Sequence, residues 1–301
     1  MADQPNIERD ISSMKHSLMR IRRRAFRLVT AASRATFLGS SSLQFRLFGR
    51  AKFTDTQGLQ YYLYPDDDLS LVFARKTLFD DQAIFPLLRQ VISSDAIVVD
   101  VGANIGLVTL YAAKNAADGH IFAFEPEQVN LERLRRNIQL ARCNNVTIVS
   151  SGVADFNGIA TLNVFSNNRV LNSLGRPIIQ TSTTTYIADT TQEVSMTTLD
   201  DFAYAHGISN IDLLKVDVEG AEPRVFAGCQ RLLSERKIHY IIFEISQTPL
   251  HALGYTAHNT FDALEQHGYV IERILPGGIT QTYDRQEDAN VILANFLAIR
   301  P

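Results

Sequence analysis

Short apolar runs alternate with longer amphipathic segments along most of the chain. Continuous apolar runs are typical of strands buried on both faces of a sheet, and apolar positions at helical spacing are typical of covering helices. We therefore expect an α/β fold with a mostly parallel sheet. The expected strands are 96–101, 120–124, 146–150, 211–216, 240–245, 269–274 and 290–299. The expected helices are 81–92, 107–117, 127–141, 196–206, 221–235 and 259–267, the third of them opened by Pro126.

Two segments depart from this alternation. Residues 59–64 and 69–73 are predicted to be short strands on either side of a Pro-Asp-Asp-Asp turn. Residues 163–195 are rich in Asn, Ser and Thr, which predicts a long surface excursion rather than a linker between domains. Such insertions often cover the acceptor site of an enzyme, so Asn172 and Ser173 are candidate substrate residues.

The N-terminal part is a basic arm with a heptad stripe of apolar residues. The stripe consists of Ile7, Ile11, Met14, Leu18, Ile21, Ala25, Leu28, Ala32 and Ala35. A helix packed on the globular body, a coiled coil that forms a homodimer, and a helix on an anionic membrane surface all fit this stripe. We expect a helical arm over 1–50 and a body over 51–301. Within the body, 51–80 is predicted to be a strand hairpin extension and 81–301 the catalytic core.

Charge and cysteine content narrow the function classes. Residues 1–50 carry ten basic and three acidic residues, whereas the remaining 251 carry 19 and 29. The acidic body excludes a basic nucleic-acid-binding domain, so no nucleic-acid partner is expected. Two cysteines are too few for a disulfide scaffold, which indicates a reducing compartment. We expect a cytoplasmic protein, with peripheral membrane contact through the arm as an alternative.

A glycine turn follows the first buried strand. In the segment VDVGANIG, Asp100 precedes Gly102, Asn104 and Gly106, and a helix is expected to start directly afterwards. Glycines let the backbone approach a ligand, and the helix start offers free N–H groups. The spacing matches neither a dinucleotide-binding G-x-G-x-x-G nor a phosphate-binding loop with Gly-Lys-Ser/Thr. It suits a cofactor with a charged amino-acid end, whose ammonium group Asp100 could hold directly or through water.

The second strand ends in Glu125, placed to accept both hydroxyls of a ribose. The fourth strand ends in the segment KVDVEGAE, which brings Lys215, Asp217 and Glu219 to the sheet edge where ligands bind, and Glu244 lies near the end of the fifth strand. A carboxylate there could take a proton from an acceptor hydroxyl. Asp217, Glu219 and Glu244 could instead hold Mg²⁺, or serve structural roles.

These motifs resemble those of the FkbM-type S-adenosylmethionine-dependent methyltransferases. The resemblance covers about residues 80–300 and rests on VDVGANIG, FAFEP and IDLLKVDVEGAEPRVFAG, in that order. It implies a Rossmann-like class I methyltransferase fold with seven strands in the order 3-2-1-4-5-7-6, the seventh antiparallel. It also implies methyl transfer to oxygen, often on a sugar or polyketide hydroxyl.

The resemblance also assigns roles to individual residues. The cofactor-binding residues are Asp100, Gly102, Asn104, Gly106, Glu125, Ser151 and Gly152, with Asp100 beneath the glycine turn and the last two beside the adenine. The segment after the third strand departs from many class I enzymes, because its first acidic residue is Asp155. Asp217, Glu219 and Glu244 are the candidate catalytic residues. Lys215 belongs to the substrate side, where we expect it to pair with a carboxylate.

The sequence therefore predicts an S-adenosylmethionine-dependent O-methyltransferase. The expected partner is a small-molecule or glycan acceptor, with the methyl group going to a sugar hydroxyl, and a divalent metal is not expected. An NAD-linked oxidoreductase with the same sheet is one alternative, against which the broken glycine fingerprint argues. A non-catalytic adaptor with a methyltransferase-like body is another, against which the presence of Asp100, Glu125 and Asp217 argues.

Overall fold

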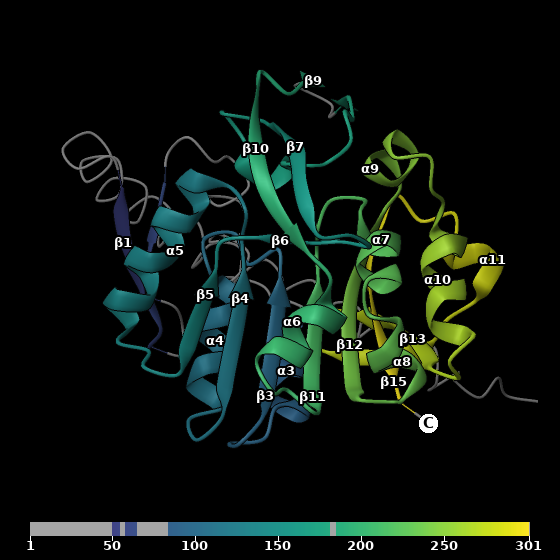
Figure 1. Cartoon of the computed structure of the whole chain (residues 1–301), viewed down its shortest axis with the longest axis horizontal. Coiled ribbons are helices and arrows are strands. Elements are labelled where there is room, and N and C mark those ends of the chain that lie inside the picture. Colours follow the sequence, from purple (N-terminus) through teal and green to yellow (C-terminus); the bar gives the residue numbers. More distant parts are fainter. Residues whose placement is uncertain (1–49, 55–57, 65–83, 181–184, 301) are drawn as a thin grey trace, which may run out of the picture. The chain divides into compact units, whose positions relative to one another are not determined.

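The computed structural model describes residues 50–54, 58–64, 84–180 and 185–300 (Figure 1). The chain separates into two units between Lys52 and Phe53, and the second unit carries the central sheet and its helices. The predicted heptad stripe and the predicted strand 69–73 lie outside the described residues. No helix in the described ranges is both long enough and apolar enough to cross a membrane.

The core of the second unit is a mixed sheet in which the described residues form eight strands. In chain order they are β3 (Ile97–Val101), β4 (His120–Phe124), β5 (Val146–Val149), β11 (Ile211–Val216), β12 (Ile238–Ser246), β13 (Val270–Leu275), β14 (Ile279–Thr282) and β15 (Leu293–Ile299). Their order across the sheet is β14-β13-β15-β12-β11-β3-β4-β5. β3, β4, β5, β11 and β12 run parallel, whereas β15 is antiparallel to both β12 and β13. All seven expected strands of the sheet are present, and the sequence prediction missed only an eighth, β14, which pairs with β13 at the edge.

The connection pattern fixes where a ligand can bind. From β3 the chain moves outward through β4 and β5, and it then returns to place β11 on the other side of β3. Neighbouring strands whose connections leave in opposite directions open a crevice at their carboxyl ends. The ends of β3 and β11 are in register there, since Lys215 pairs with Asp100 and Val216 with Val101.

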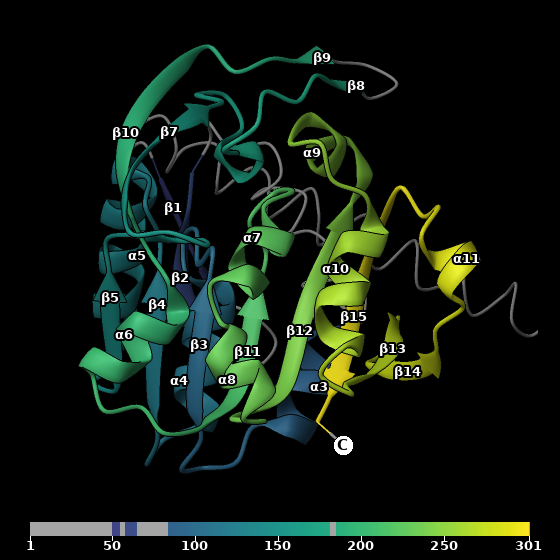
Figure 2. The ribbon, with the colours of Figure 1, turned by 45° about the vertical axis from the view of Figure 1, so that its right-hand side comes forward.

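Helices cover both faces of the sheet. Figure 2 shows α6 (Leu199–Ala205), α8 (Gln230–Ser234) and α10 (Ala257–Glu265) in front of the sheet, and α3 (Ile84–Val91) and α4 (Leu107–Asn115) behind it. The remaining helices are α5 (Gln128–Ala141), α7 (Glu222–Ala227), α9 (Gln247–Ala252) and α11 (Arg285–Asp288). Apolar strand positions such as Val99 and Leu214 pack against helix residues such as Phe226 and Phe261 in one buried cluster.

Three helix predictions need correction. Pro126 does not open α5, because Glu127 is its N-cap and accepts a hydrogen bond from the backbone of Asn130. Residues 196–197 end a strand, and α6 begins only after its cap Thr198. The segment 221–235 forms two helices, α7 and α8, separated at Gly228. A Cβ atom on Gly228 would lie 1.9 Å from the carbonyl oxygen of Ala154, so the chain approaches too closely there for another residue.

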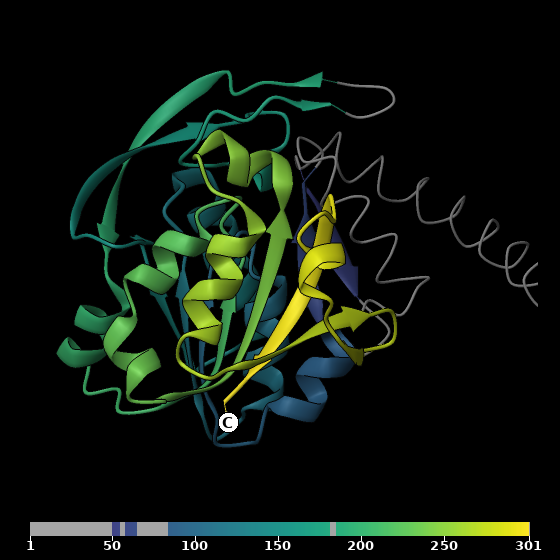
Figure 3. The same ribbon diagram turned by 90° about the vertical axis from the view of Figure 1, so that its right-hand side faces the viewer.

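The described residues of the polar excursion form short strands and a turn beyond the carboxyl ends of the parallel strands (Figure 3). We call residues 152–197 the cap. It contains β6 (Gly152–Val153), β7 (Gly158–Val164), the 3₁₀ turn η1 (Arg169–Leu171), β8 (Ile179–Gln180), β9 (Thr185–Tyr186) and β10 (Thr190–Thr197). β10 pairs with both β6 and β7, and buried residues such as Leu162 and Val194 give the cap a small apolar core.

A small two-stranded sheet precedes the core. It consists of β1 (Ala51–Thr54) and β2 (Gln60–Leu63), so the predicted strand 59–64 is present. The backbone N–H of Tyr62 donates to Asn137 Oδ1 over 2.7 Å, which attaches β2 to α5.

Candidate functional site

The glycine turn after β3 packs directly on the tip of β11. Gly102 has φ +79°, and a Cβ atom there would lie 1.9 Å from the backbone oxygen of Asp217. Gly102 and Asn104 line a cavity of about 510 Å³ between the turn, the strand tips and the cap. Gly106 lies off the cavity wall. Its role is to make room for Leu134 of α5, since a Cβ atom would lie 2.4 Å from that side chain.

Asp100 lies beneath the glycine turn and not on the cavity wall. Its fully buried carboxylate accepts a 2.6 Å hydrogen bond from the hydroxyl of Thr109 and lies 3.4 Å from the ammonium of Lys215. Asp100 therefore cannot contact a ligand in the cavity directly. It acts on the site through Lys215.

Lys215 links the glycine turn to the carboxylates of Asp100 and Asp217. Its ammonium donates to the carbonyl oxygen of Gly102 over 3.0 Å and lies 3.3 Å from the carboxylate of Asp217. Burial alone would lower the pKa of Lys215, but the charges of Asp217 and Asp100 outweigh burial and raise it. The residue is therefore a permanent cation, and the sequence prediction that it pairs with a carboxylate is confirmed.

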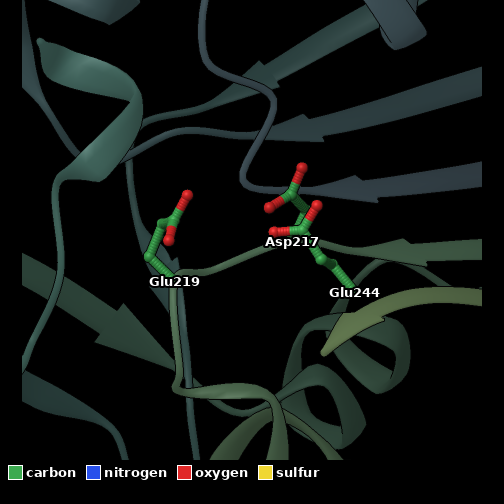
Figure 4. A group of neighbouring side chains, drawn as sticks. All are labelled: Asp217, Glu219 and Glu244. Carbon is green, nitrogen blue, oxygen red and sulfur yellow. The ribbon is translucent and has the colours of Figure 1, made fainter. Parts of the chain in front are cut away.

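Three carboxylates face one space at the carboxyl ends of the parallel strands (Figure 4). One oxygen from each of Asp217, Glu219 and Glu244 lies within 4.8 Å of the other two. Burial, followed by the charge of Asp217, raises the pKa of both Glu219 and Glu244 well above the ordinary value. Such a group can hold a shared proton, accept a proton from a hydroxyl, or bind a hard divalent cation.

The turn that carries Glu219 is held from two sides. Glu219 has φ +51°, a left-handed conformation that residues other than glycine seldom adopt. Glu222 Oε1 accepts from the backbone N–H groups of Val218 and Gly220 over 3.1 and 3.4 Å. Ser173 Oγ donates to the carbonyl oxygen of Glu219 over 2.7 Å. Sequence reasoning did not assign a role to Glu222, although its place three residues after Glu219 was the available signal.

On the other side of the cavity, Glu125 occupies the tip of β4. Its Oε2 accepts from the backbone N–H of Asn104 over 2.8 Å, and its Oε1 accepts from that of Glu127 over 2.9 Å. Burial raises its pKa to about 7. Each carboxylate oxygen retains a lone pair, so the group can still accept hydrogen bonds from a ligand.

The other predicted residues divide between the wall and its support. Gly152 and Asn172 lie on the cavity wall. Ser151 lies off it and donates to the carbonyl oxygen of Ser195 over 3.0 Å, while Ser173 supports Glu219. The wall beyond the carboxylates is mostly apolar and comes from Leu162, Val170, Leu171, Leu174, Ile179, Pro249, Ile292 and Leu293.

Comparisons of the sequence with known proteins find methyltransferases. Residues 100–271 match the family profile described as Methyltransferase FkbM domain. The chain is 28% identical over 192 residues to Methyltransferase 1 of Beauveria bassiana, a match that covers 58% of this chain and 73% of that protein. Methyltransferase sdnD of Sordaria araneosa is 31% identical over 192 residues, covering 56% and 72%. The 31-O-demethyl-FK506 methyltransferase FkbM of Streptomyces tacrolimicus is 30% identical over 155 residues, covering 44% and 59%.

Proposed function

Because the chain belongs to the FkbM methyltransferase family, we propose that it transfers the methyl group of S-adenosylmethionine to a hydroxyl oxygen. The observation that carries the proposal is that a single cavity has a group suited to a ribose at one end and a cluster of carboxylates at the other. Glu125 lies at the end beside β4, and the carboxylates of Asp217, Glu219 and Glu244 lie at the end beside β11 and β12.

The residues of the cavity fit this cofactor. Gly102 lets the turn pack closely on β11 while its backbone lines the cavity, and Glu125 keeps lone pairs that can accept ribose hydroxyls. When bound, S-adenosylmethionine supplies an activated methyl group on a positively charged sulfur. The carboxylate of Asp217, whose side chain is 39% exposed, supplies a negative charge on the cavity wall for that cation.

Transfer to an alcohol needs a base that takes the hydroxyl proton as the new bond forms. We assign this task to the pair Glu219 and Glu244. Burial and the neighbouring carboxylates raise the pKa of both, which makes each a stronger base than an ordinary glutamate, and both lie on the cavity wall. Lys215 already places a positive charge beside Asp217, so the proposed mechanism uses no divalent cation.

The composition of the cavity wall supports a more specific class of acceptor than any sugar hydroxyl. The sequence resemblance implies a sugar hydroxyl, and carbohydrate recognition draws on polar groups at the site. The cavity offers Asn172, Gln180, Ser246 and Thr248 as such groups beside a larger apolar wall. We propose that the hydroxyl belongs to a glycolipid or to a glycoside with an apolar aglycone, rather than to a bare glycan.

Calorimetry and label transfer test the proposal. We expect S-adenosylhomocysteine to bind, and the tritiated methyl group of S-adenosylmethionine to reach octyl β-glucoside faster than glucose. Asp217→Asn, Glu219→Gln and Glu244→Gln should retain S-adenosylhomocysteine affinity and lose turnover. Wild-type protein that binds NADH but not S-adenosylhomocysteine would replace the proposal with the oxidoreductase alternative. Full turnover in all three variants would remove the carboxylates from the chemistry.

We propose that the protein is cytoplasmic and that the basic arm controls its placement. The full chain can be tested for sedimentation with anionic vesicles and for dimerisation by light scattering. Changing Arg22, Arg23 and Arg24 together to Gln should abolish vesicle binding if the arm lies on a membrane, and should leave a coiled-coil dimer intact. Neither arm function is expected to change S-adenosylhomocysteine affinity.

A further inference from the structure

Asn130 is a buried residue on the cavity wall whose carboxamide oxygen has no protein partner among the described residues. It lies in the first turn of α5, is 2% exposed, and its backbone N–H donates to Glu127 Oε2 over 2.8 Å. Its side-chain Oδ1 is buried, and none of the described residues donates a hydrogen bond to it. A buried acceptor without a donor destabilises a folded protein, because it has lost its hydrogen bonds to water and gained none in return.

A second buried asparagine on the same helix has a purely structural set of hydrogen bonds. Asn137 is fully buried, and its Oδ1 accepts from the backbone N–H of Tyr62 over 2.7 Å. Its Nδ2 donates to the carbonyl oxygen of Ile105 over 2.8 Å. Asn137 therefore joins α5 to its neighbours, whereas the orphaned oxygen of Asn130 belongs to a residue on the cavity wall. The difference indicates that the partner of Asn130 is a ligand.

The surroundings of Asn130 define that ligand. Glu125 and Glu127 are acceptors, and the guanidinium of Arg169 donates to Glu127 Oε1 over 2.9 Å. Oδ1 lacks a hydrogen-bond donor, and Asn130 lines the same cavity as Glu125, whose free lone pairs can accept hydroxyl groups. A ribose carries two neighbouring hydroxyls, so one can donate to Glu125 and the other to Asn130.

We propose that Asn130 is a cofactor-binding residue that accepts a hydrogen bond from a ribose hydroxyl of the cofactor, next to Glu125. This inference rests on the proposed function, because it takes the ligand to be an adenosine derivative. It goes beyond that function by assigning a contact to a residue outside the glycine turn and the strand tips.

The experiment compares Asn130→Ala with Asn137→Ala in the full-length protein. Without ligand, Asn130→Ala should not lower the melting temperature, since it removes an unpaired buried acceptor, whereas Asn137→Ala should lower it. By calorimetry, Asn130→Ala should weaken S-adenosylhomocysteine binding at least tenfold, and folded Asn137→Ala should bind like the wild type. Asn130→Leu, closer in volume, should behave like Asn130→Ala.

Adenosine, 2′-deoxyadenosine and 3′-deoxyadenosine then identify the contacting group. The penalty of Asn130→Ala should persist with adenosine and disappear with one of the two deoxynucleosides. Equal S-adenosylhomocysteine affinity in wild type and Asn130→Ala would overturn the inference, as would an undiminished penalty with both deoxynucleosides. Wild-type protein that fails to bind S-adenosylhomocysteine would instead refute the proposed function itself.

Discussion

The hydroxyl of Ser173 donates a 2.7 Å hydrogen bond to the backbone carbonyl of Glu219, so the cap holds the turn that carries this proposed catalytic carboxylate. Ser173 is fully buried, and its backbone is bonded to Asn163 in both directions. The donor is therefore fixed in place. Since Glu219 adopts a left-handed conformation, this bond helps to keep its side chain aimed at the cavity.

Ser173→Ala should lower turnover about fivefold, the effect of one lost hydrogen bond of about 1 kcal/mol on the position of Glu219. Affinity for S-adenosylhomocysteine should stay the same, because Ser173 does not reach the cavity wall. In a Glu219→Gln background the substitution should have little further effect. Ser234→Ala, which removes an exposed hydroxyl-to-carbonyl bond on α8, is the matched control. Equal additional losses in both backgrounds would show that Ser173 does not act through Glu219.

Lys215→Met should destabilise the protein by about 3–5 kcal/mol, because it leaves the fully buried charge of Asp100 without its cation. Urea unfolding monitored by circular dichroism measures the change. The control is Arg136→Met, which breaks an exposed pair with Glu132 on α5 and should cost less than about 1 kcal/mol. Similar losses for the two variants would contradict the role assigned to Lys215.

Gly102→Ala should abolish S-adenosylhomocysteine binding, because the new Cβ atom would lie 1.9 Å from the backbone of Asp217 and force the glycine turn away from β11. Gly207 also has a positive φ, but apart from its two chain neighbours none of the described residues has an atom within 4 Å of the place that a Cβ atom would take there. Gly207→Ala should therefore cost only about 1–2 kcal/mol of stability from the left-handed conformation and should keep its affinity. Calorimetry measures the S-adenosylhomocysteine affinity of both variants. A loss in Gly102→Ala alone would show that the steric clash, and not the left-handed conformation, prevents binding.

The free energy of unfolding without ligand should fall as the pH rises from about 4.5 to about 7. Burial raises the pKa of Glu222 to about 7 from an ordinary value of 4.5, so in this window the folded state binds more protons than the unfolded state. Glu222→Gln keeps the acceptor oxygen for Val218 and Gly220, and it should flatten the decline by up to about 3 kcal/mol. Urea titrations at pH 5 and pH 8 measure this, with the exposed Glu193→Gln as control. An unchanged slope in Glu222→Gln would rule out this source of the pH dependence.

Methyl transfer should survive exhaustive chelation. The ammonium of Lys215 already lies beside Asp217, and burial raises the pKa of Glu219 and Glu244, which favours their neutral form without a cation. Turnover after dialysis against EDTA, compared with turnover after readdition of Mg²⁺, measures the dependence. Loss on chelation followed by recovery with Mg²⁺ would assign the three carboxylates to a cation instead.

The sequence was sufficient to predict the α/β fold and the two ends of the site. Apolar runs and amphipathic segments identify strands and helices locally, and the carboxyl ends of parallel strands meet at one edge of a sheet. Glu125, Asp217 and Glu244 therefore had to come together once their strands were recognised. The glycine turn was equally local, because Gly102 and Asn104 follow the first strand directly.

Only the tertiary structure decided what each residue does there. Asp100 and Gly106 belong to the same motif as Gly102, yet one pairs with Lys215 beneath the turn and the other accommodates Leu134. Ser173 supports Glu219 from 46 residues away in the chain, and Asn130 differs from Asn137 only in its surroundings. Periodicity reports which face of a segment is buried, whereas hydrogen bonds depend on which distant segments pack together. The sequence therefore determined where the site lies. The packing of the cap, the glycine turn and α5 determined which residues face the cavity and which support them.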